Sequence, residues 1–288
     1  MARPLTIAPV DATFGAVVTG FSIPEIDDET FEALYAAWLK YALLIFPAQH
    51  LTRAQQIAFA KRFGPLEFEM TALSNVKEDG TLRLEKDNDD RMKILKGNMG
   101  WHADSTYMPV QAKGAVFSAE VVPTVGGQTG FADMRAAYDA LDDATRARVE
   151  RLSAYHSLHY SQSKLGHQTT KGDGEYSGYG FNNKGQVPLR PLVKVHPETG
   201  RKNLVIGRHA HNIPGLTPQD SERLLQELID FACQSPRIYH HNWRPGDAVL
   251  WDNRRLMHQA TPWDMTQPRI MWHSRIAGDP VSEAALAA

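Results

Sequence analysis

Short apolar runs separated by turn residues are the feature that most restricts how this chain can fold. After Trp101 they occupy residues 115–118, 192–195, 204–206, 248–251 and 270–272. Runs of this length suit buried β-strands and are too short for stable helices. Two helical patterns interrupt them, one near 134–141 and one that begins at Thr217-Pro218 with Thr217 as N-cap. The pattern predicts a β-barrel or jelly roll with helices packed outside it.

The N-terminal quarter shows a mixed pattern of strands and helices. Residues 15–20 and 43–46 read as short strands, and residues 30–40 carry apolar side chains at helical spacing. A capping box at Thr52 begins a second helix, which ends at Gly64-Pro65. Two polar or glycine-rich segments, 67–99 and 172–185, break the apolar pattern. In the first of them, Asp79-Gly80 predicts a hairpin turn.

Composition excludes several classes of protein. The chain has 288 residues, 42% of them hydrophobic, which is typical of a globular protein and not of a disordered one. The net charge of −2 gives no basic surface for nucleic acid or for an anionic membrane, and no apolar run approaches the ~20 residues of a membrane span. We therefore expect a homo-oligomer that binds a small molecule. Cys233 is the only cysteine, and no signal-peptide pattern follows Met1, so we expect a cytoplasmic location.

The strongest local motif is the pair His102 and Asp104. In a strand, residues i and i+2 point to the same face, so both side chains could reach one metal. His258 follows the buried run 248–251 and could supply a third ligand from a late strand. Two imidazoles and one carboxylate form the facial triad of non-haem Fe(II) oxygenases, which leaves coordination positions open. The alternative is a surface strand with an ordinary His–Asp hydrogen bond, because a single His-x-Asp is common by chance.

A second motif is the alternating run 269–275. Alternation places Arg269, His273 and Arg275 on one face of a strand. Arginines that face a barrel interior are costly to bury unless they meet anions. A guanidinium binds a carboxylate through two parallel hydrogen bonds, so Arg269 suits a dicarboxylate co-substrate. The alternative is an exposed strand face with structural ion pairs.

Together these motifs resemble the taurine/2,4-dichlorophenoxyacetate dioxygenase family over nearly the whole chain. The resemblance rests on residues 44–52, 59–66, 101–104, 126–129 and 251–254, and on the spacing from His258 to Arg269. It implies an Fe(II)- and 2-oxoglutarate-dependent dioxygenase on a double-stranded β-helix, which is a jelly roll (cupin-like) that is mainly β with flanking helices. It also implies a single domain over residues 1–288, with lid-like segments near 67–97 and 163–190.

The resemblance also assigns roles to individual residues. It implies that His102, Asp104 and His258 bind iron, and that Thr129 and Arg269 hold the distal carboxylate of 2-oxoglutarate. Dioxygen is then the remaining co-substrate, and succinate and CO2 are products. The tight turn that Gly126-Gly127 would form in any fold is compatible with these roles.

Within the family, the chain from Asn98 onward is most similar to the aryloxyalkanoate dioxygenases. This similarity implies hydroxylation of a phenoxypropionate or phenoxyacetate herbicide at the carbon beside the ether oxygen, which releases a phenol and a keto acid. Taurine dioxygenase carries an arginine four residues after its 2-oxoglutarate arginine, where this chain has His273. The role of binding the substrate carboxylate must then fall to His273, Arg275, Arg208 or Lys96, and Arg208 with His209 is the favoured pair. The predicted substrate contacts are Asn98, Tyr107, Arg208, His209, His273 and Arg275.

Two other functions fit the same motifs. A member of the same family that oxidises a sulfonate or an alkyl sulfate would differ only in the site for the substrate anion. A metal-binding β-barrel without catalytic activity would keep the three ligands and lack turnover. A zinc hydrolase fits less well, because no general base beside the triad is evident and Arg269 would have no partner. Two of the predicted substrate contacts have a competing interpretation. Tyr107 could be a plain core residue, and Arg208 could form a surface ion pair.

Overall fold

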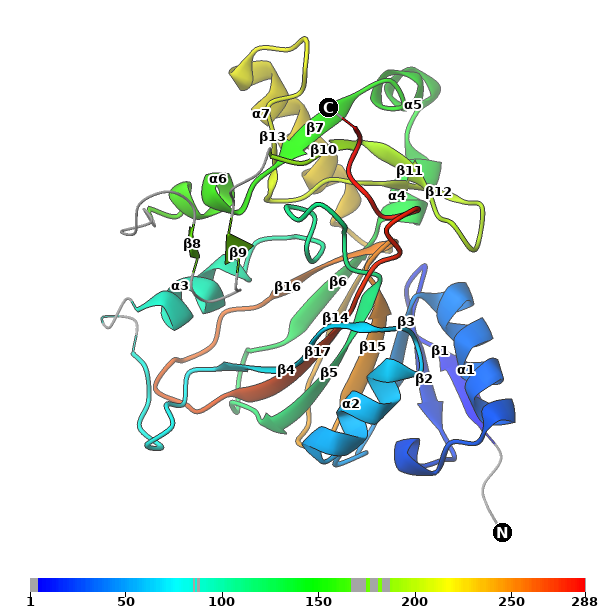
Figure 1. Cartoon of the computed structure of the whole chain (residues 1–288), viewed down its shortest axis with the longest axis vertical. Coiled ribbons are helices and arrows are strands. Elements are labelled where there is room, and N and C mark those ends of the chain that lie inside the picture. Colours follow the sequence, from blue (N-terminus) through cyan, green and yellow to red (C-terminus); the bar gives the residue numbers. More distant parts are fainter. Residues whose placement is uncertain are drawn as a thin grey trace.

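Two facing β-sheets form the centre of the computed structural model (Figure 1), which describes residues 5–84, 86, 89–166, 175–176, 181–182 and 187–287. The larger sheet has, in spatial order, β1 (Thr6–Pro9), β2 (Ala16–Thr19), β3 (Leu43–Phe46), β15 (Ala248–Asp252), β5 (Gly114–Val121), β17 (Ile270–Ile276) and β4 (Leu66–Ser74). The smaller sheet has β14 (Ile238–His241), β6 (Thr129–Asp133) and β16 (Leu256–Ala260). The arrangement confirms the predicted mainly β jelly roll with flanking helices.

The central strands of the larger sheet are buried on both faces, which is why they read as continuous apolar runs. In β3, Leu43 and Ile45 pack between the sheets with Phe131 of the smaller sheet. The alternate residues Leu44 and Phe46 pack against the helices outside. All four β3 side chains are at most 2% exposed. Burial on both faces explains the absence of apolar–polar alternation in this strand.

Two helices cover the outer face of the larger sheet, α1 (Asp28–Tyr41) and α2 (Arg53–Lys61) (Figure 1). The predicted capping box of α2 is confirmed. The backbone N–H of Gln55 donates to the Thr52 hydroxyl at 3.3 Å, and the backbone N–H of Thr52 donates to Oε1 of the Gln55 side chain at 2.9 Å. These bonds satisfy backbone donors that the first turn of a helix otherwise leaves without partners.

Other helices cover the outer face of the smaller sheet. Ala132 of β6 and Met257 of β16 pack there with α4 (Met134–Ala140) and α7 (Pro218–Ala232), which begins at its predicted N-cap Thr217. No helix among the described residues is both long enough and apolar enough to cross a membrane. The remaining elements are η1 (Ile23–Glu25), α3 (Asp90–Gly97), α5 (Asp143–Val149), β7 (Ser153–His156), α6 (Leu158–Ser163), β8 (Glu175–Tyr176), β9 (Phe181–Asn182), β10 (Leu189–Pro191), β11 (Val193–Val195), β12 (Lys202–Leu204) and β13 (Ala210–His211).

The polar segment that followed residue 66 in the sequence contains more regular structure than its composition suggested. Its first part is β4, which pairs with β17 as the last strand of the larger sheet, and its last part is α3. Glu67 and Glu69 alternate with less polar residues, as an edge strand allows. The expected hairpin turn at Asp79-Gly80 is present, with Val76 bridged to Leu82. Most of the second predicted lid, 163–190, lies outside the described residues.

Candidate active site

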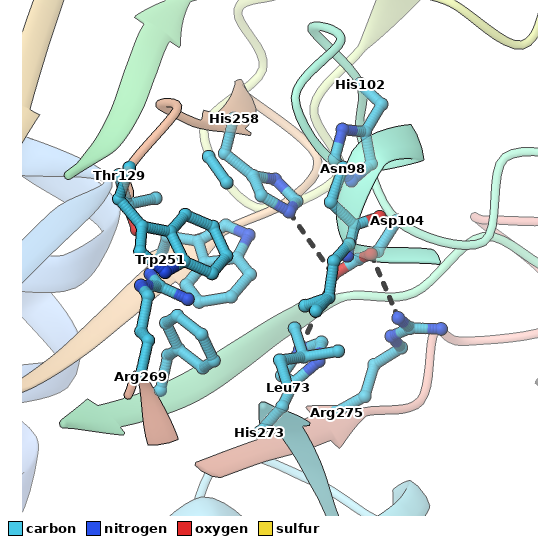
Figure 2. Close-up of a pocket in the computed structure, with 14 residues that line it drawn as sticks. Leu73, Asn98, His102, Asp104, Thr129, Trp251, His258, Arg269, His273 and Arg275 are labelled. Atoms are coloured by element: carbon cyan, nitrogen blue, oxygen red, sulfur yellow. Dashed lines mark hydrogen bonds and ion pairs between the residues drawn. The ribbon is translucent and has the colours of Figure 1, made fainter. Parts of the chain in front are cut away.

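A pocket lies between the two sheets (Figure 2), and Leu95 of α3 lines part of it. Side chains from both sheets and from the loops beside them reach into it. The lining residues are Leu73, Leu95, Asn98, His102, Asp104, Phe117, Thr129, Trp251, His258, Ala260, Trp263, Arg269, His273 and Arg275.

The backbone brings two of the predicted metal ligands face to face. His102 and His258 form an antiparallel bridge, in which the His102 N–H donates at 3.0 Å and the His258 N–H at 2.7 Å. Their ring centroids are 4.3 Å apart. Nδ1 of His102 lies 2.7 Å from the Gly100 carbonyl oxygen. If Nδ1 carries the proton of that hydrogen bond, Nε2 keeps a lone pair for a metal.

The expectation that Asp104 lies in a strand with His102 is wrong. Only His102 makes a β-bridge, and Asp104 begins a turn in which Ser105 has a φ of 57°. His258 lies within β16, which follows β15 along the chain, so it comes from a late strand as expected. The carboxylate still reaches the imidazoles, because the turn carries the chain back beneath them (Figure 2).

The three side chains offer a donor set that fits a divalent metal. Their possible ligand atoms all lie within 4.8 Å of one another. Oδ1 of Asp104 accepts a hydrogen bond from Arg275 at 3.0 Å, whereas Oδ2 is buried without a hydrogen-bond partner and lies 3.9 Å from Nε2 of His258. A buried carboxylate oxygen without a partner is costly unless something positive meets it. Two imidazoles with one carboxylate are suited to Fe(II).

Electrostatics prepares these ligands for a metal. Burial lowers the pKa of both His102 and His258, so the imidazoles are neutral and their lone pairs are available. Burial acts to raise the pKa of Asp104, but the neighbouring Arg275 guanidinium is the largest of the influences that outweigh it and hold the pKa below its ordinary value. The carboxylate is therefore charged at neutral pH.

Arg269 lies on the side of the pocket opposite His102 and Asp104 (Figure 2). It is 2% exposed, its Nε donates to the Gly127 carbonyl oxygen at 3.2 Å, and its Nη2 is buried without a hydrogen-bond partner. Burial lowers its pKa to about 10, which leaves it a cation at neutral pH. Among the described residues, no carboxylate forms an ion pair with it. The guanidinium is therefore available to an anion in the pocket.

Thr129 lies on the same side of the pocket as Arg269 (Figure 2). Its hydroxyl oxygen accepts a hydrogen bond from Nε1 of Trp243 at 2.9 Å. The indole can only donate, so the hydroxyl hydrogen stays free to be donated to an acceptor in the pocket. Sequence reasoning gave no role to Trp243. A hydroxyl donor beside a buried guanidinium fits a carboxylate.

The predicted substrate contacts divide into two groups. Asn98, His273 and Arg275 line the pocket. The His273 ring lies between Phe68 and Trp251, and burial lowers its pKa to about 3, so it is a neutral imidazole there. Arg275 also donates to Ser105 Oγ at 3.1 Å.

Tyr107, Arg208 and His209 do not line this pocket. Tyr107 packs in a small core cluster, and its ring contacts His209 with centroids 4.8 Å apart. His209 is buried and its Nδ1 pairs with Ser161 Oγ at 2.9 Å. Arg208 lines a neighbouring pocket together with Gly97. The core interpretation of Tyr107 is therefore the one that the geometry favours.

Comparison with known proteins gives consistent results. The model of the family "Taurine catabolism dioxygenase TauD, TfdA family" matches residues 3–275. A (S)-phenoxypropionate/alpha-ketoglutarate-dioxygenase from Sphingobium herbicidovorans is 78% identical over 287 residues, which is 100% of both chains. A protein of the same name from Delftia acidovorans is 61% identical over 291 residues and 99% of both chains.

A solved structure is also similar. The crystal structure of AAD-2 in complex with Mn(II) and N-oxalylglycine has a TM-score of 0.88 and 35% identity, and the match covers 98% of this chain and 100% of that one. The family model, the full-length relatives and the solved structure agree with one another on the family. The chain belongs to the TauD/TfdA family and is an α-ketoglutarate (2-oxoglutarate)-dependent dioxygenase, for which the family implies iron.

Proposed function

We propose that this enzyme hydroxylates an aryloxyalkanoate at the carbon beside the ether oxygen, with consumption of 2-oxoglutarate and O2. The products are a phenol, a keto acid, succinate and CO2. One observation carries the proposal. Asp104, whose Oδ2 lacks a hydrogen-bond partner, and the buried cation Arg269 line the same pocket. The names of the relatives at 78% and 61% identity support the phenoxypropionate class of substrate.

In this proposal each side of the pocket has its own task. His102, Asp104 and His258 would hold the iron, while Thr129 and Arg269 would bind the distal carboxylate of 2-oxoglutarate. Bound iron and 2-oxoglutarate together supply the activation of O2 and the oxidation of the substrate carbon. Arg269 orients the co-substrate through its fixed guanidinium fork.

The rest of the pocket would place the substrate. Apolar side chains such as Leu73, Phe117 and Trp263 exclude water and suit an aryl ring. His273 and Arg275 reach the pocket directly and are candidates for the substrate carboxylate, with Asn98 beside them. Arg208 lies against Gly97 and lines the neighbouring pocket, so it is a less direct candidate. Hydroxylation beside the ether oxygen gives a hemiacetal-like product, which collapses to the phenol and the keto acid without further help from the protein.

The test measures succinate formation with both phenoxypropionate enantiomers, phenoxyacetate, taurine and alkyl sulfates. We expect succinate in step with phenol release from at least one phenoxypropionate enantiomer. Coupling to sulfonates or sulfate esters alone would overturn the substrate assignment and favour the other family activity. A relative from Pseudomonas putida with 30% identity is named as a sulfate ester dioxygenase. The interpretation as a barrel without catalytic activity is set aside, because full-length relatives are dioxygenases by name.

The domain organisation, assembly and location of the protein can also be proposed. We propose that residues 1–288 form one dioxygenase domain, since residues 102 and 258 meet in one pocket. We also propose a cytoplasmic homo-oligomer that acts on small carboxylates and not on nucleic acid or membranes. Light scattering coupled to size-exclusion chromatography tests the assembly, and a mass equal to that of one chain would contradict it.

A further inference from the structure

Two buried asparagines each fasten the backbone of one residue that faces the pocket. The first is Asn253, which is 2% exposed and follows β15. Its Oδ1 accepts from the Asp104 N–H at 2.7 Å, and its Nδ2 donates to the carbonyl oxygens of Asp104 and Ala112, both at 2.9 Å. This amide therefore holds the residue that carries the candidate metal-binding carboxylate.

The second asparagine repeats the pattern on the other side of the pocket. Asn75 is 0% exposed and follows β4. Its Oδ1 accepts from the Arg269 N–H at 2.8 Å, and its Nδ2 donates to the carbonyl oxygens of Met265 and Gln267, both at 3.0 Å. This amide therefore fixes the start of the strand that presents the candidate 2-oxoglutarate arginine.

Asp104 and Arg269, the residues that the two asparagines bind, both lie outside regular strand pairing. Asp104 lies in a turn, and Arg269 precedes the first residue of β17, so neither is held by a strand ladder. A buried backbone N–H must nevertheless find a partner. A side-chain amide offers one acceptor and two donors, which is enough to replace one rung of a ladder and to tie in a second segment of chain.

We propose that Asn253 is a positioning residue for Asp104 and that Asn75 is a positioning residue for Arg269. The inference rests on the proposed function, in which these two residues bind the metal and the co-substrate. Each amide contacts only one of them, so the two effects are separable. Loss of Asn253 should weaken metal binding, and loss of Asn75 should weaken 2-oxoglutarate binding.

The experiment compares Asn253→Ala with Asn75→Ala, each of which is the matched control for the other. Free Mn(II) is measured by its electron paramagnetic resonance signal, and 2-oxoglutarate binding by equilibrium dialysis at saturating Mn(II). We expect Asn253→Ala to weaken Mn(II) binding by about 10- to 100-fold, as is typical when support for a metal ligand is lost. We expect Asn75→Ala to leave Mn(II) affinity within about twofold. It should weaken 2-oxoglutarate binding by roughly tenfold, the effect if the displaced Arg269 loses one hydrogen bond to the co-substrate carboxylate.

Equal loss of both ligands in both variants, or no loss in either, would overturn the inference, because a merely structural role would not separate them. Circular dichroism checks the fold. If an alanine variant does not fold, Asn253→Ser and Asn75→Ser, whose hydroxyl can keep part of the hydrogen bonding, are measured in its place. Asp104→Ala and Arg269→Ala serve as references. If these two variants bind both ligands as the wild type does, the proposed function fails; if only the asparagine variants do, the positioning inference alone fails.

Discussion

At the scale of single residues, Arg269, which directly precedes β17, and Arg275, which lies within it, differ in their partners although both line the same pocket. Arg275 donates to the Asp104 carboxylate at 3.0 Å and forms a second ion pair with Glu67 at 3.4 Å. Arg269 has no carboxylate partner among the described residues. The alternation in the sequence predicts that both point inward, which is correct. It cannot show which guanidinium is already neutralised, because the partners come from β4 and from the turn after His102.

Replacing Arg275 by Met should leave a buried carboxylate without its partner. We expect the free energy of unfolding of the metal-free protein to fall by about 3 kcal/mol, which is typical for a broken buried pair. Mn(II) should then raise the melting temperature more than it does in the wild type, because the metal neutralises Asp104. Calorimetry with and without Mn(II) measures both effects, and Arg275→Lys, which keeps the charge, should lose less. If Arg275→Met instead melts at the same temperature as the wild type and has a raised KM for the aryloxy acid, Arg275 binds the substrate.

Replacing Arg269 by Ala should raise the concentration of 2-oxoglutarate needed for half-maximal succinate formation. One charge-assisted contact is worth about 1.5–3 kcal/mol, and about 1.4 kcal/mol corresponds to tenfold, so we expect roughly a 10- to 100-fold increase. Arg269→Lys should recover part of it, because a lysine supplies the charge without the fork. An unchanged requirement in Arg269→Ala would contradict the co-substrate assignment.

At the scale of elements, the clearest sequence patterns gave correct predictions. The run Leu43–Phe46 is β3, and the capping box at Thr52 begins α2 at Arg53. The polar segment after residue 66, for which we predict a lid, contains β4 and α3. An edge strand needs little apolar side chain of its own, since hydrogen bonds to β17 hold it in the sheet. Such a strand carries almost no signal in a single sequence.

Replacing Thr52 by Ala should destabilise the protein without impairing the site. The variant loses the side-chain cap of α2, which we expect to lower the free energy of unfolding by about 1 kcal/mol. Thr52→Ser should behave as the wild type because Ser caps equally well. Urea denaturation gives the stabilities. Turnover should be unchanged in folded protein, since Thr52 does not line the active-site pocket; an equal midpoint for Thr52→Ala and wild type would show that the cap contributes nothing.

At the scale of the whole molecule, a charge network that is buried at Asp252 and exposed at Glu198 links the first helix to the centre of the larger sheet. Asp252 at the end of β15 pairs with Arg254 and His196, and Arg254 also pairs with Glu198 at 2.6 Å. Glu198 accepts a hydrogen bond from Tyr35 of α1. Burial acts to raise the pKa of Asp252, but Arg254 and His196 outweigh it and hold the pKa well below its ordinary value.

This network predicts part of the response to acid. Because the pKa of Asp252 is lower in the folded than in the unfolded state, its stabilisation is present above the unfolded pKa, about 3.9, and is lost as the pH falls below that value. Asp252→Asn should therefore be less stable at pH 7, and its stability should fall less steeply between about pH 5 and pH 3. Urea midpoints across this range measure the slopes. Parallel slopes for Asp252→Asn and wild type would contradict the prediction.

The sequence by itself determined the fold class, the family and the ligand set of His102, Asp104 and His258 that we propose. Apolar runs and spaced motifs are local, so one chain is enough to show them. Only the tertiary structure decided which polar atoms are left without a hydrogen-bond partner, as with Oδ2 of Asp104 and Nη2 of Arg269, and which residues hold Asp104 and Arg269 in place. Asn253 was visible within a motif but had no evident task, and Asn75 had no signal at all. Their hydrogen bonds join residues 149 and 194 positions apart, and such pairings exist only after the sheets have come together.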